Sequence, residues 1–402
     1  MRQLTGIVCE FDPFHQGHFY LLSEVRRRNP ETTIVCALSG AFVQRGDPAC
    51  FSAWDRAQAA AACGADLVLL LPFPYSMAPA DRFAAAAVSL LRDLGCDSLA
   101  FGTENAEEKA LRSVAEKLDS PEFSRLFKNR LLNQKHDSEG FPSLRWKVYR
   151  EQYGEAEASL MLTPNNILGI EYLRHAEGLE PILVPRTGAA HGENVLKTGC
   201  FASSTAIRSL LRSGETEQAL SFLPGPAATV FRDALKRGTA VLFPEVKASP
   251  IVFWTLGTRS PEELSRYAGA EGGVAEYLIR KARFCSSLQE LFLSLESKKH
   301  TRSFYRRAVW SCVFGVTPEV LSRPPAFSLV LAATPAGQRV LRNRKGGIPV
   351  LSRPASGNRL SGEAETLFRL SLQAELFRSS LSDSPLSESR YLALSPYLTG
   401  KD

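Results

Sequence analysis

The first hundred residues alternate short apolar runs with longer amphipathic segments. Apolar runs occupy residues 4–11 (LTGIVCEF) and 32–39 (TTIVCALS), and each precedes a segment of helical length, one from about Gly17 and one from about Ser52. Two further runs, DLVLLLP and DSLAFG, flank an alanine-rich stretch over residues 78–94. Apolar strands that are each followed by a helix are typical of a parallel sheet covered on both faces. The pattern therefore predicts a doubly wound α/β domain.

This pattern is interrupted once and then resumes. Residues 105–160 are polar, carry a helical pattern and show no clear strand. After them, PNNILGIEYLRHAEG predicts a helix, EPILVPR a strand, and SSTAIRSLLRSG a helix with Ser203 or Ser204 at its N-cap and Gly214 near its end. Beyond residue 215 the strand pattern fades and helices dominate.

The length of 402 residues favours two domains over one. We expect residues 1–215 to form a Rossmann-like nucleotide-binding domain and residues 216–402 to form a mainly helical domain. Hydrophobic residues make up 44% of the chain and charged residues 22%, which is the composition of an ordinary globular protein. A chain that is disordered throughout is excluded.

The cysteines and the apolar runs bear on the compartment. The eight cysteines form no C-x-x-C pair and several lie in apolar runs such as IVCEF, so we expect buried free thiols in a reducing compartment and no protein-bound metal. No apolar stretch reaches 18 residues, and the N-terminus lacks the apolar core of a signal peptide. These features predict a cytoplasmic protein without membrane contact, and they favour no particular oligomeric state.

Positive charge is concentrated in one part of the chain. The formal charge is +6, yet the stretch from Arg280 to Leu360 holds 15 Lys or Arg against three Glu, a local charge of +12 that leaves −6 for the remainder. A basic region on an acidic body suggests a polyanionic partner. A solvated basic face explains the charge equally well.

The motif FDPFHQGH, residues 11–18, lies where the first predicted strand gives way to the first helix. Ligands of open α/β sheets bind at the carboxyl ends of strands, beside helix N-termini. His15 and His18 would face a phosphate there, and Gly17 allows the backbone to approach it. Fixed donors at that point stabilise the transition state of phosphoryl transfer. The H-x-x-H spacing alone would also suit a metal site or a plain helix start, but the preceding strand, the proline and the glycine favour nucleotide chemistry.

A second motif, SGAFVQRGDP at residues 39–48, follows the second strand-like run. Its glycines suit an irregular loop, whereas Gln44 and Arg45 offer polar groups at the same sheet edge. Turn chemistry would explain the glycines but less readily the cluster of polar side chains. We therefore expect a substrate loop that includes Ser39, Gly40, Gln44 and Arg45.

Later strand ends and helix starts carry further candidates. FGTE places Gly102 at a strand end, where a nucleoside could approach the backbone. PNNILG places Asn165 and Asn166 at a helix start, where N-capping is as good an explanation as ligand contact. VPR places Arg186 just after a strand, in position to pair with a phosphate. SSTAIR adds an anion site at a helix N-terminus, formed by Ser204, Thr205 and Arg208.

These motifs in order resemble a known family. FDPFHQGH followed by SSTAIR is similar to the HxGH-type nucleotidyltransferases, which attack the α-phosphate of ATP and release pyrophosphate. More narrowly, GIVCEFDPFHQGHFYLL, SGAFVQRGDPA, DLVLLLPFPYS, FGTEN, PNNILGIEYL and FASSTAIR together resemble the tRNA(Met) cytidine acetate ligase family over nearly all of residues 1–212. The resemblance implies activation of acetate as acetyl-adenylate and acetyl transfer to N4 of the wobble cytidine of elongator tRNA(Met).

The resemblance also implies roles for individual residues, which are carried over at the positions that match each motif. His15 and His18 would stabilise the phosphates during adenylation, and Asn166 is favoured over Asn165 as the ligand. Mg²⁺ would arrive with ATP, held mainly by phosphates and water. The implied ATP-binding residues are Val8, Cys9, Glu10, Phe11, Asp12, Pro13, Phe14, Gln16, Gly17, Leu21, Gly102, Asn165, Asn166, Arg186, Ser204 and Thr205.

The likeness is weaker in the C-terminal part. KKHTRSFYRRAVWSCVFGV resembles the family's basic helical segment, and Arg302, Arg306 and Arg307 are spaced to contact tRNA phosphates. Two positions depart from the family: Asp12 stands where Asn is usual, and Ser328 where Arg is usual. Two alternatives therefore remain, an adenylyltransferase acting on a small metabolite and a non-catalytic RNA-binding relative.

Overall fold

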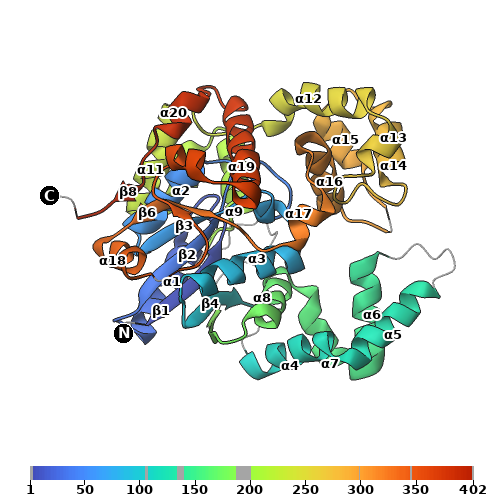
Figure 1. Cartoon of the computed structure of the whole chain (residues 1–402), viewed down its shortest axis with the longest axis horizontal. Coiled ribbons are helices and arrows are strands. Elements are labelled where there is room, and N and C mark those ends of the chain that lie inside the picture. Colours follow the sequence, from blue (N-terminus) through green and yellow to red (C-terminus); the bar gives the residue numbers. More distant parts are fainter. Residues whose placement is uncertain are drawn as a thin grey trace.

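A computed structural model of the chain describes residues 3–104, 107–133, 140–186, 201–297, 299–344 and 346–400. Its centre is an eight-stranded sheet with helices on both sides, so the predicted α/β class is confirmed (Figure 1). The strands are β1 (Leu4–Cys9), β2 (Thr33–Ser39), β3 (Leu67–Leu71), β4 (Ser98–Thr103), β5 (Glu180–Pro185), β6 (Ser328–Ala333), β7 (Val350–Leu351) and β8 (Tyr397–Leu398).

The order of the strands determines where a ligand can bind. The order is β5-β4-β1-β2-β3-β6-β7, with β8 beside β6, and β1 to β5 are parallel. Ile7 of β1 lies in register with Cys36 of β2 and with Ala100 of β4. The chain leaves β1 toward β2 on one side and returns to β4 on the other, so the carboxyl ends of β1 and β4 flank the switch point of the topology. Crevices at such points are the usual ligand sites of open α/β sheets.

The helices that cover this sheet begin where the sequence predicted. Ser52 caps α2 and Ser203 caps α9 through their side chains, and Gly214 follows α9 at φ 83°, a left-handed conformation that suits glycine. Helices α3 and α8 pack against each other beside the sheet, as do α2 and α11 (Gly225–Lys236). The helices of this part are α1 (Gln16–Arg28), α2 (Ala53–Ala62), the 3₁₀ turn η1 (Tyr75–Met77), α3 (Ala80–Asp93), α8 (Pro164–His175) and α9 (Ser204–Arg212).

A helical segment separates β4 from β5, as predicted for residues 105–160. Among its described residues the structure contains helices and no strand, and Figure 1 shows them together at one side of the molecule, below α8 and α3. Val114 and Tyr149 are buried there and join the main core. The segment comprises α4 (Glu108–Asp119), α5 (Pro121–Leu132), α6 (Phe141–Tyr153), α7 (Glu155–Ala158) and the 3₁₀ turn η2 (Ser159–Leu162).

The C-terminal part is mainly helical and builds a second core. Buried side chains such as Leu278, Leu291 and Trp310 form this core, and Figure 1 shows α12 to α16 gathered beside the sheet. The helices after residue 215 are α10 (Thr216–Ser221), α11 (Gly225–Lys236), α12 (Pro244–Thr258), α13 (Pro261–Leu264), α14 (Val274–Ala282), α15 (Leu288–Ser294), α16 (Arg302–Phe314), α17 (Pro318–Ser322), α18 (Pro335–Asn343), η3 (Pro354–Arg359), α19 (Gly362–Ser380) and α20 (Glu388–Leu392).

The C-terminal part also returns to the first sheet, which the sequence pattern did not indicate. Strand β6 pairs with β3 in the antiparallel direction, and β7 and β8 pair with β6. Its sequence SLVLAA is fully buried, and a short buried run has no periodicity that separates strand from helix. The boundary at residue 215 stays a prediction, but the chain beyond it contributes both to the sheet core and to the helical core.

Strand β6 contains Ser328, one of the two positions that depart from the family. Its side chain is fully buried, and its Oγ donates to the carbonyl oxygen of Leu70 at 2.7 Å. The hydroxyl therefore contributes to the pairing of β6 with the sheet core.

The cysteines of the described residues have free thiols. Six of them are buried and Cys285 is half-buried, as expected, while Cys200 lies outside the described residues. Within the described ranges no group of three or more His, Cys, Asp or Glu could hold a metal ion. None of the helices in the same ranges is long and apolar enough to span a membrane.

Candidate active site

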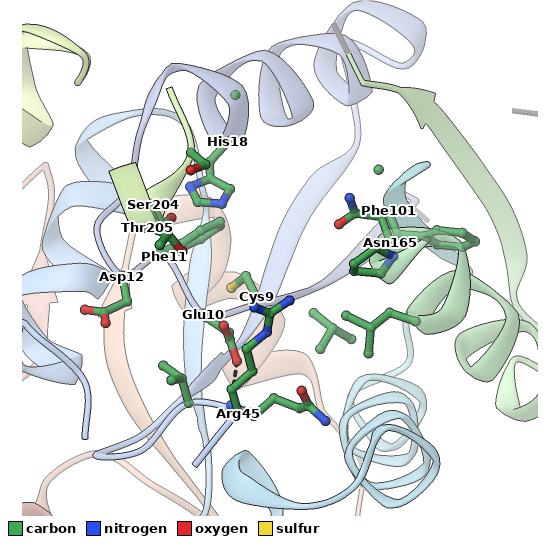
Figure 2. Close-up of a pocket in the computed structure, with 18 of the residues that line it drawn as sticks. Cys9, Glu10, Phe11, Asp12, His18, Arg45, Phe101, Asn165, Ser204 and Thr205 are labelled. Atoms are coloured by element: carbon green, nitrogen blue, oxygen red, sulfur yellow. Dashed lines mark hydrogen bonds between the residues drawn. The ribbon is translucent and has the colours of Figure 1, made fainter. Parts of the chain in front are cut away.

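A cavity of about 520 Å³ opens at the carboxyl ends of β1 and β4. It contains many of the predicted residues and brings together segments that are far apart in the chain (Figure 2). The predicted residues that line it are Val8, Cys9, Glu10, Phe11, Asp12, His15, Gly17, His18, Leu21, Gln44, Arg45, Gly102, Asn165, Arg186, Ser204, Thr205 and Arg307. Those that do not line it are Pro13, Phe14, Gln16, Ser39, Gly40, Asn166, Arg302 and Arg306.

The two histidines lie at the start of α1 and hold each other in place. His15 is the N-cap residue, and its Nδ1 accepts a hydrogen bond from the Gly17 N–H at 3.0 Å. His18 Nδ1 accepts from the His15 N–H at 3.3 Å, and the two rings stack with centroids 3.8 Å apart. Because both Nδ1 atoms are acceptors, each neutral ring carries its proton on Nε2. The site thus contains two fixed Nε2–H donors.

The surroundings of His18 keep it uncharged. Burial lowers the pKa of His18 well below the ordinary value of 6.5, and the neighbouring His15 and Arg186 lower this pKa further. A neutral imidazole needs no counter-ion and still donates a hydrogen bond. His18 therefore acts as a neutral donor and not as a cation.

Asp12 does not bring negative charge to this donor pair. Its carboxylate is only 4% exposed and accepts hydrogen bonds from the N–H groups of Cys50 at 3.0 Å and Phe51 at 3.1 Å. The Arg208 guanidinium lies 3.9 Å from the same carboxylate and donates to the Asp12 carbonyl at 2.6 Å. The departure from the family pattern at this position is accommodated because the charge is paired and its acceptors are used.

The N-terminus of α9 lies beside the histidines. Ser203 caps the helix by accepting from the Ala206 N–H at 3.2 Å, and Ser204 Oγ lies 3.5 Å from the Pro13 carbonyl oxygen that it donates to. Figure 2 shows Ser204 and Thr205 next to His18 at one end of the cavity. The N-termini of α1 and α9 therefore both contribute residues to this part of the cavity, and the positive ends of their dipoles favour an anion such as phosphate.

The opposite wall comes from β4, β5 and α8, where Gly102, Arg186 and Asn165 lie. Asn165 Nδ2 donates to Glu104, and Asn166 is fully buried, with its N–H donating to Glu104 Oε2 at 3.1 Å. The N-cap residue of α8 is Thr163, so the capping interpretation of the two asparagines is wrong. The preference for Asn166 as a ligand is not supported either, because Asn165 lines the cavity and Asn166 does not.

The loop over residues 39–48 contributes Gln44 and Arg45 to the lining of the cavity. Figure 2 shows Arg45 reaching from this loop into the cavity beside Glu10. Gln44 is held by three hydrogen bonds: its N–H donates to Glu10 Oε1 at 2.7 Å, its Nε2 to the Ala78 carbonyl at 3.3 Å, and its carbonyl accepts from Arg307 Nη1 at 3.2 Å. Ser39 and Gly40 are buried behind the loop, so only part of the predicted substrate loop reaches the cavity.

The three arginines that the sequence assigned to tRNA phosphates do not share one outward face. Arg306 pairs with Asp47 at 2.7 Å, and Arg307 lines the cavity, where burial lowers its pKa to about 10. Arg302 is the most exposed of the three and pairs with Glu296 at 2.9 Å. Two of the three therefore hold the cavity loop instead of presenting their charge to solvent.

The sequence reasoning missed a large part of the lining. Most of the missed residues are apolar side chains of the walls, which carry no motif, and Thr301 and Ser303 come from the start of α16, some 290 residues after β1. Arg208, which the sequence placed in the anion site of α9, and Asp47 of the predicted loop over residues 39–48 also line the cavity. The missed lining residues are Tyr20, Val43, Ala80, Phe83, Phe101, Pro164, Ile167, Leu168, Tyr172, Val184, Pro185, Phe201, Ser203, Thr301 and Ser303.

The histidine pair lies at the switch point of a parallel sheet and beside a second helix N-terminus. This arrangement suits a nucleotidyltransferase, and the comparison with known families supports the same conclusion. The sequence model of the HIGH Nucleotidyl Transferase family matches residues 2–390. The chain belongs to this family. The match extends through both cores and includes the C-terminal strands β6 and β7, and it ends before β8.

Relatives within this HIGH nucleotidyltransferase family share a name. A protein of Lysinibacillus sphaericus named tRNA(Met) cytidine acetate ligase is 30% identical over 94% of this chain and 96% of its own length. A protein of Syntrophotalea carbinolica with the same name is 32% identical over 84% of this chain and 81% of its own length.

Solved structures share the fold. Thermotoga maritima TmcAL in an apo crystal form superposes with a TM-score of 0.89 at 24% identity, covering 98% of this chain and 99% of that one. A second crystal form of the same protein, bound with α-thio ATP, gives a TM-score of 0.84 at 23% identity with the same coverage.

Proposed function

We propose that this chain is an ATP-dependent tRNA(Met) cytidine acetate ligase. It would activate acetate as acetyl-adenylate, release pyrophosphate, and transfer the acetyl group to N4 of the wobble cytidine of elongator tRNA(Met). The relatives that carry this name and match most of the chain support the proposal. The observation that carries it is the pair of fixed Nε2–H donors of His15 and His18 beside the N-terminus of α9.

The cavity offers a place for each part of ATP. The segment from Val8 to Leu21 and the N-terminus of α9, with Ser204 and Thr205, would hold the phosphates. Gly102, Asn165 and Arg186 would hold the nucleoside and the first phosphate from the β4 and β5 side. A Cβ at Gly102 would lie 3.4 Å from Arg186 Cγ, so a side chain there would fill space between the strand and the arginine.

The chemistry follows from this placement. A carboxylate oxygen of acetate forms a bond to the α-phosphorus, the bond from that phosphorus to the bridging oxygen breaks, and the electron pair leaves with pyrophosphate. The Nε2–H groups of His15 and His18 stabilise the growing charge on the phosphate oxygens without transferring a proton. In the second step the cytidine N4 attacks the acetyl carbon, AMP leaves, and one proton of the amine passes to a base.

The carboxylates of the cavity favour magnesium that arrives with ATP. Glu10 holds the Gln44 N–H, Asp12 holds two N–H groups, and Asp47 pairs with Arg306. These acids already have partners, so phosphate oxygens and water would supply most of the ligands. The tRNA substrate implies a cytoplasmic enzyme, and the basic surface of residues 280–360 would contact its backbone.

One experiment separates the three functions considered. The purified protein is incubated with ATP and acetate, with and without bulk tRNA, and pyrophosphate and acetylcytidine are measured. Acetate-dependent pyrophosphate release together with tRNA acetylation supports the proposal. A further set of reactions replaces acetate with small metabolites. Pyrophosphate release with one of these metabolites, without acetylation of any tRNA, would identify a metabolite adenylyltransferase. RNA binding without any pyrophosphate release would identify a non-catalytic relative.

A further inference from the structure

The end of the cavity opposite the histidines has a chemical character of its own. It is lined by Gln44 and Arg45 of the loop after β2 and by Thr301, Ser303 and Arg307 of the helical core. Figure 2 places Arg45 and Glu10 at one end and His18 at the other. The groups proposed to hold the departing pyrophosphate lie at the His18 end, so this second end is left for a different ligand.

The charges at this end favour an anion. Among the described residues neither Arg45, which is exposed, nor Arg307, which is half-buried, forms an ion pair, and burial lowers the pKa of Arg307 although the nearby Asp81 raises it. The neighbouring acids have partners, since Glu10 Oε1 accepts from the Gln44 N–H and Asp47 pairs with Arg306. A guanidinium that lines a cavity and touches no carboxylate is stabilised by an anion that binds beside it.

The loop that carries Arg45 is held from both sides. Gln44 bonds to Glu10, to the Ala78 carbonyl and to Arg307, so its backbone is fixed immediately before Arg45. Gly46, immediately after Arg45, has φ 82°, and a Cβ there would lie 3.1 Å from the Arg307 backbone nitrogen. The base of Arg45 is therefore rigid while its guanidinium extends into the cavity.

The direction of the proposed reaction identifies the anion. In-line displacement at the α-phosphorus requires the attacking oxygen to approach from the side opposite the leaving pyrophosphate. With pyrophosphate at the His15, His18 and α9 end, the attacking carboxylate comes from the Arg45 end. Arginine suits a carboxylate because its planar fork can bind both oxygens.

We propose that Arg45, with Arg307 behind it, binds the carboxylate of the acid substrate and aims it at the α-phosphorus of ATP. This inference rests on the proposed function and names the acid subsite of the same cavity. Val43 precedes Gln44, and Ala80 and Phe83 lie just beyond Ala78, whose carbonyl Gln44 contacts. These apolar residues line the cavity beside the carboxylate site and fit the alkyl end of a short aliphatic acid.

The test measures acid-dependent exchange between pyrophosphate and ATP, run without tRNA and with it. We expect Arg45→Gln to raise the KM for acetate at least tenfold and to change the KM for ATP less than twofold. Arg45→Lys keeps the positive charge but loses the planar guanidinium. Its KM for acetate should lie between that of the wild type and that of Arg45→Gln. The matched control is Arg266→Gln, an exposed arginine of the helical core that does not line the cavity. Arg45 has no hydrogen bond within the described residues, so the variant should remain folded, which circular dichroism checks.

Each result decides a different question. An unchanged acetate KM for Arg45→Gln, together with lost tRNA acetylation, would assign Arg45 to an RNA phosphate and overturn the acid subsite. An unchanged acetate KM with normal acetylation would overturn it as well. Absence of acetate-dependent exchange in the wild-type protein, with or without tRNA, would reject the proposed function itself. Val43→Ala gives an independent measurement, because enlarging the alkyl site should raise kcat/KM for butyrate relative to acetate at least fivefold.

Discussion

Arg306 and Asp47, which lie 259 positions apart in the chain, form an ion pair at 2.7 Å between Nη1 and Oδ1. Asp47 belongs to the cavity loop after β2, and Arg306 belongs to helix α16 of the second core. The next residue, Arg307, donates to the Gln44 carbonyl of the same loop at 3.2 Å. The helical core thereby sets the position of a loop at the nucleotide cavity, so the two parts of the chain are not independent.

The first prediction concerns this ion pair. Both side chains are about one third exposed, at 31% and 38%, so removing the pair should lower the free energy of unfolding by only about 0.2–1 kcal/mol. Asp47→Asn should nevertheless raise the acetate KM several-fold, because the loop that carries Arg45 loses one anchor. Urea unfolding and pyrophosphate exchange measure the two quantities.

A double-mutant cycle provides the control for this pair. Arg306→Gln should reproduce the effect of Asp47→Asn, and the double variant should be no worse than either single variant. Fully additive effects on the acetate KM would show that the two residues act separately, against the arrangement described.

The second prediction concerns the histidine pair. His18→Ala removes one fixed donor and should lower kcat for adenylation by about 100- to 1,000-fold, the usual cost of one donor to a developing oxyanion. The matched control is His175→Gln, since His175 ends α8 and does not line the cavity. Stopped-flow or exchange kinetics measure the change. If kcat of a correctly folded His18→Ala variant falls less than tenfold, His18 does not stabilise the phosphate charge as proposed.

The elements that local signals specify could be predicted from the sequence. Helix α2 begins after Ser52 and α9 after Ser203, because each serine side chain satisfies an N–H group of the first turn. Strands β1 to β5 alternate with helices and carry continuous apolar runs, so their parallel arrangement was also predictable. The same order places FDPFHQGH and Gly102 at neighbouring strand ends, which is why the histidines and this glycine were found.

Long-range contacts could not be predicted in this way. Nothing in the sequence SLVLAA indicates that it pairs with β3, some 260 residues earlier, because both run through apolar core with no periodic pattern. Arg307 resembled a surface cation in a basic segment, and only the fold turns it toward Gln44. The sequence showed only that Asp12 departs from the family pattern, and the fold supplies the N–H groups of Cys50 and Phe51 that its carboxylate accepts from.

The third prediction concerns Asp12. Asp12→Ala leaves the buried N–H groups of Cys50 and Phe51 without acceptors, which should cost about 1–3 kcal/mol of folding free energy for each group. Asp12→Asn keeps one carbonyl acceptor and removes the charge that faces Arg208. This variant should lose less folding free energy than Asp12→Ala, and it should retain adenylation activity. Chemical denaturation ranks the variants. Equal stability of Asp12→Ala and the wild type would show that these hydrogen bonds contribute nothing.

The last prediction concerns pH. Burial lowers the pKa of His18 well below the ordinary value of 6.5, so below about pH 6.5 the unfolded chain binds a proton that the folded chain does not. The stability associated with the neutral ring is present above pH 6.5 and is lost as the pH falls, with a slope of at most about 1.4 kcal/mol per pH unit for one group. The raised pKa of the half-buried Glu10 acts in the opposite direction, which makes the comparison with a variant necessary. We expect the free energy of unfolding of His18→Gln to fall less than that of the wild type between pH 7 and pH 5.5. Parallel curves for the two proteins would contradict the assignment of a neutral His18 with a lowered pKa.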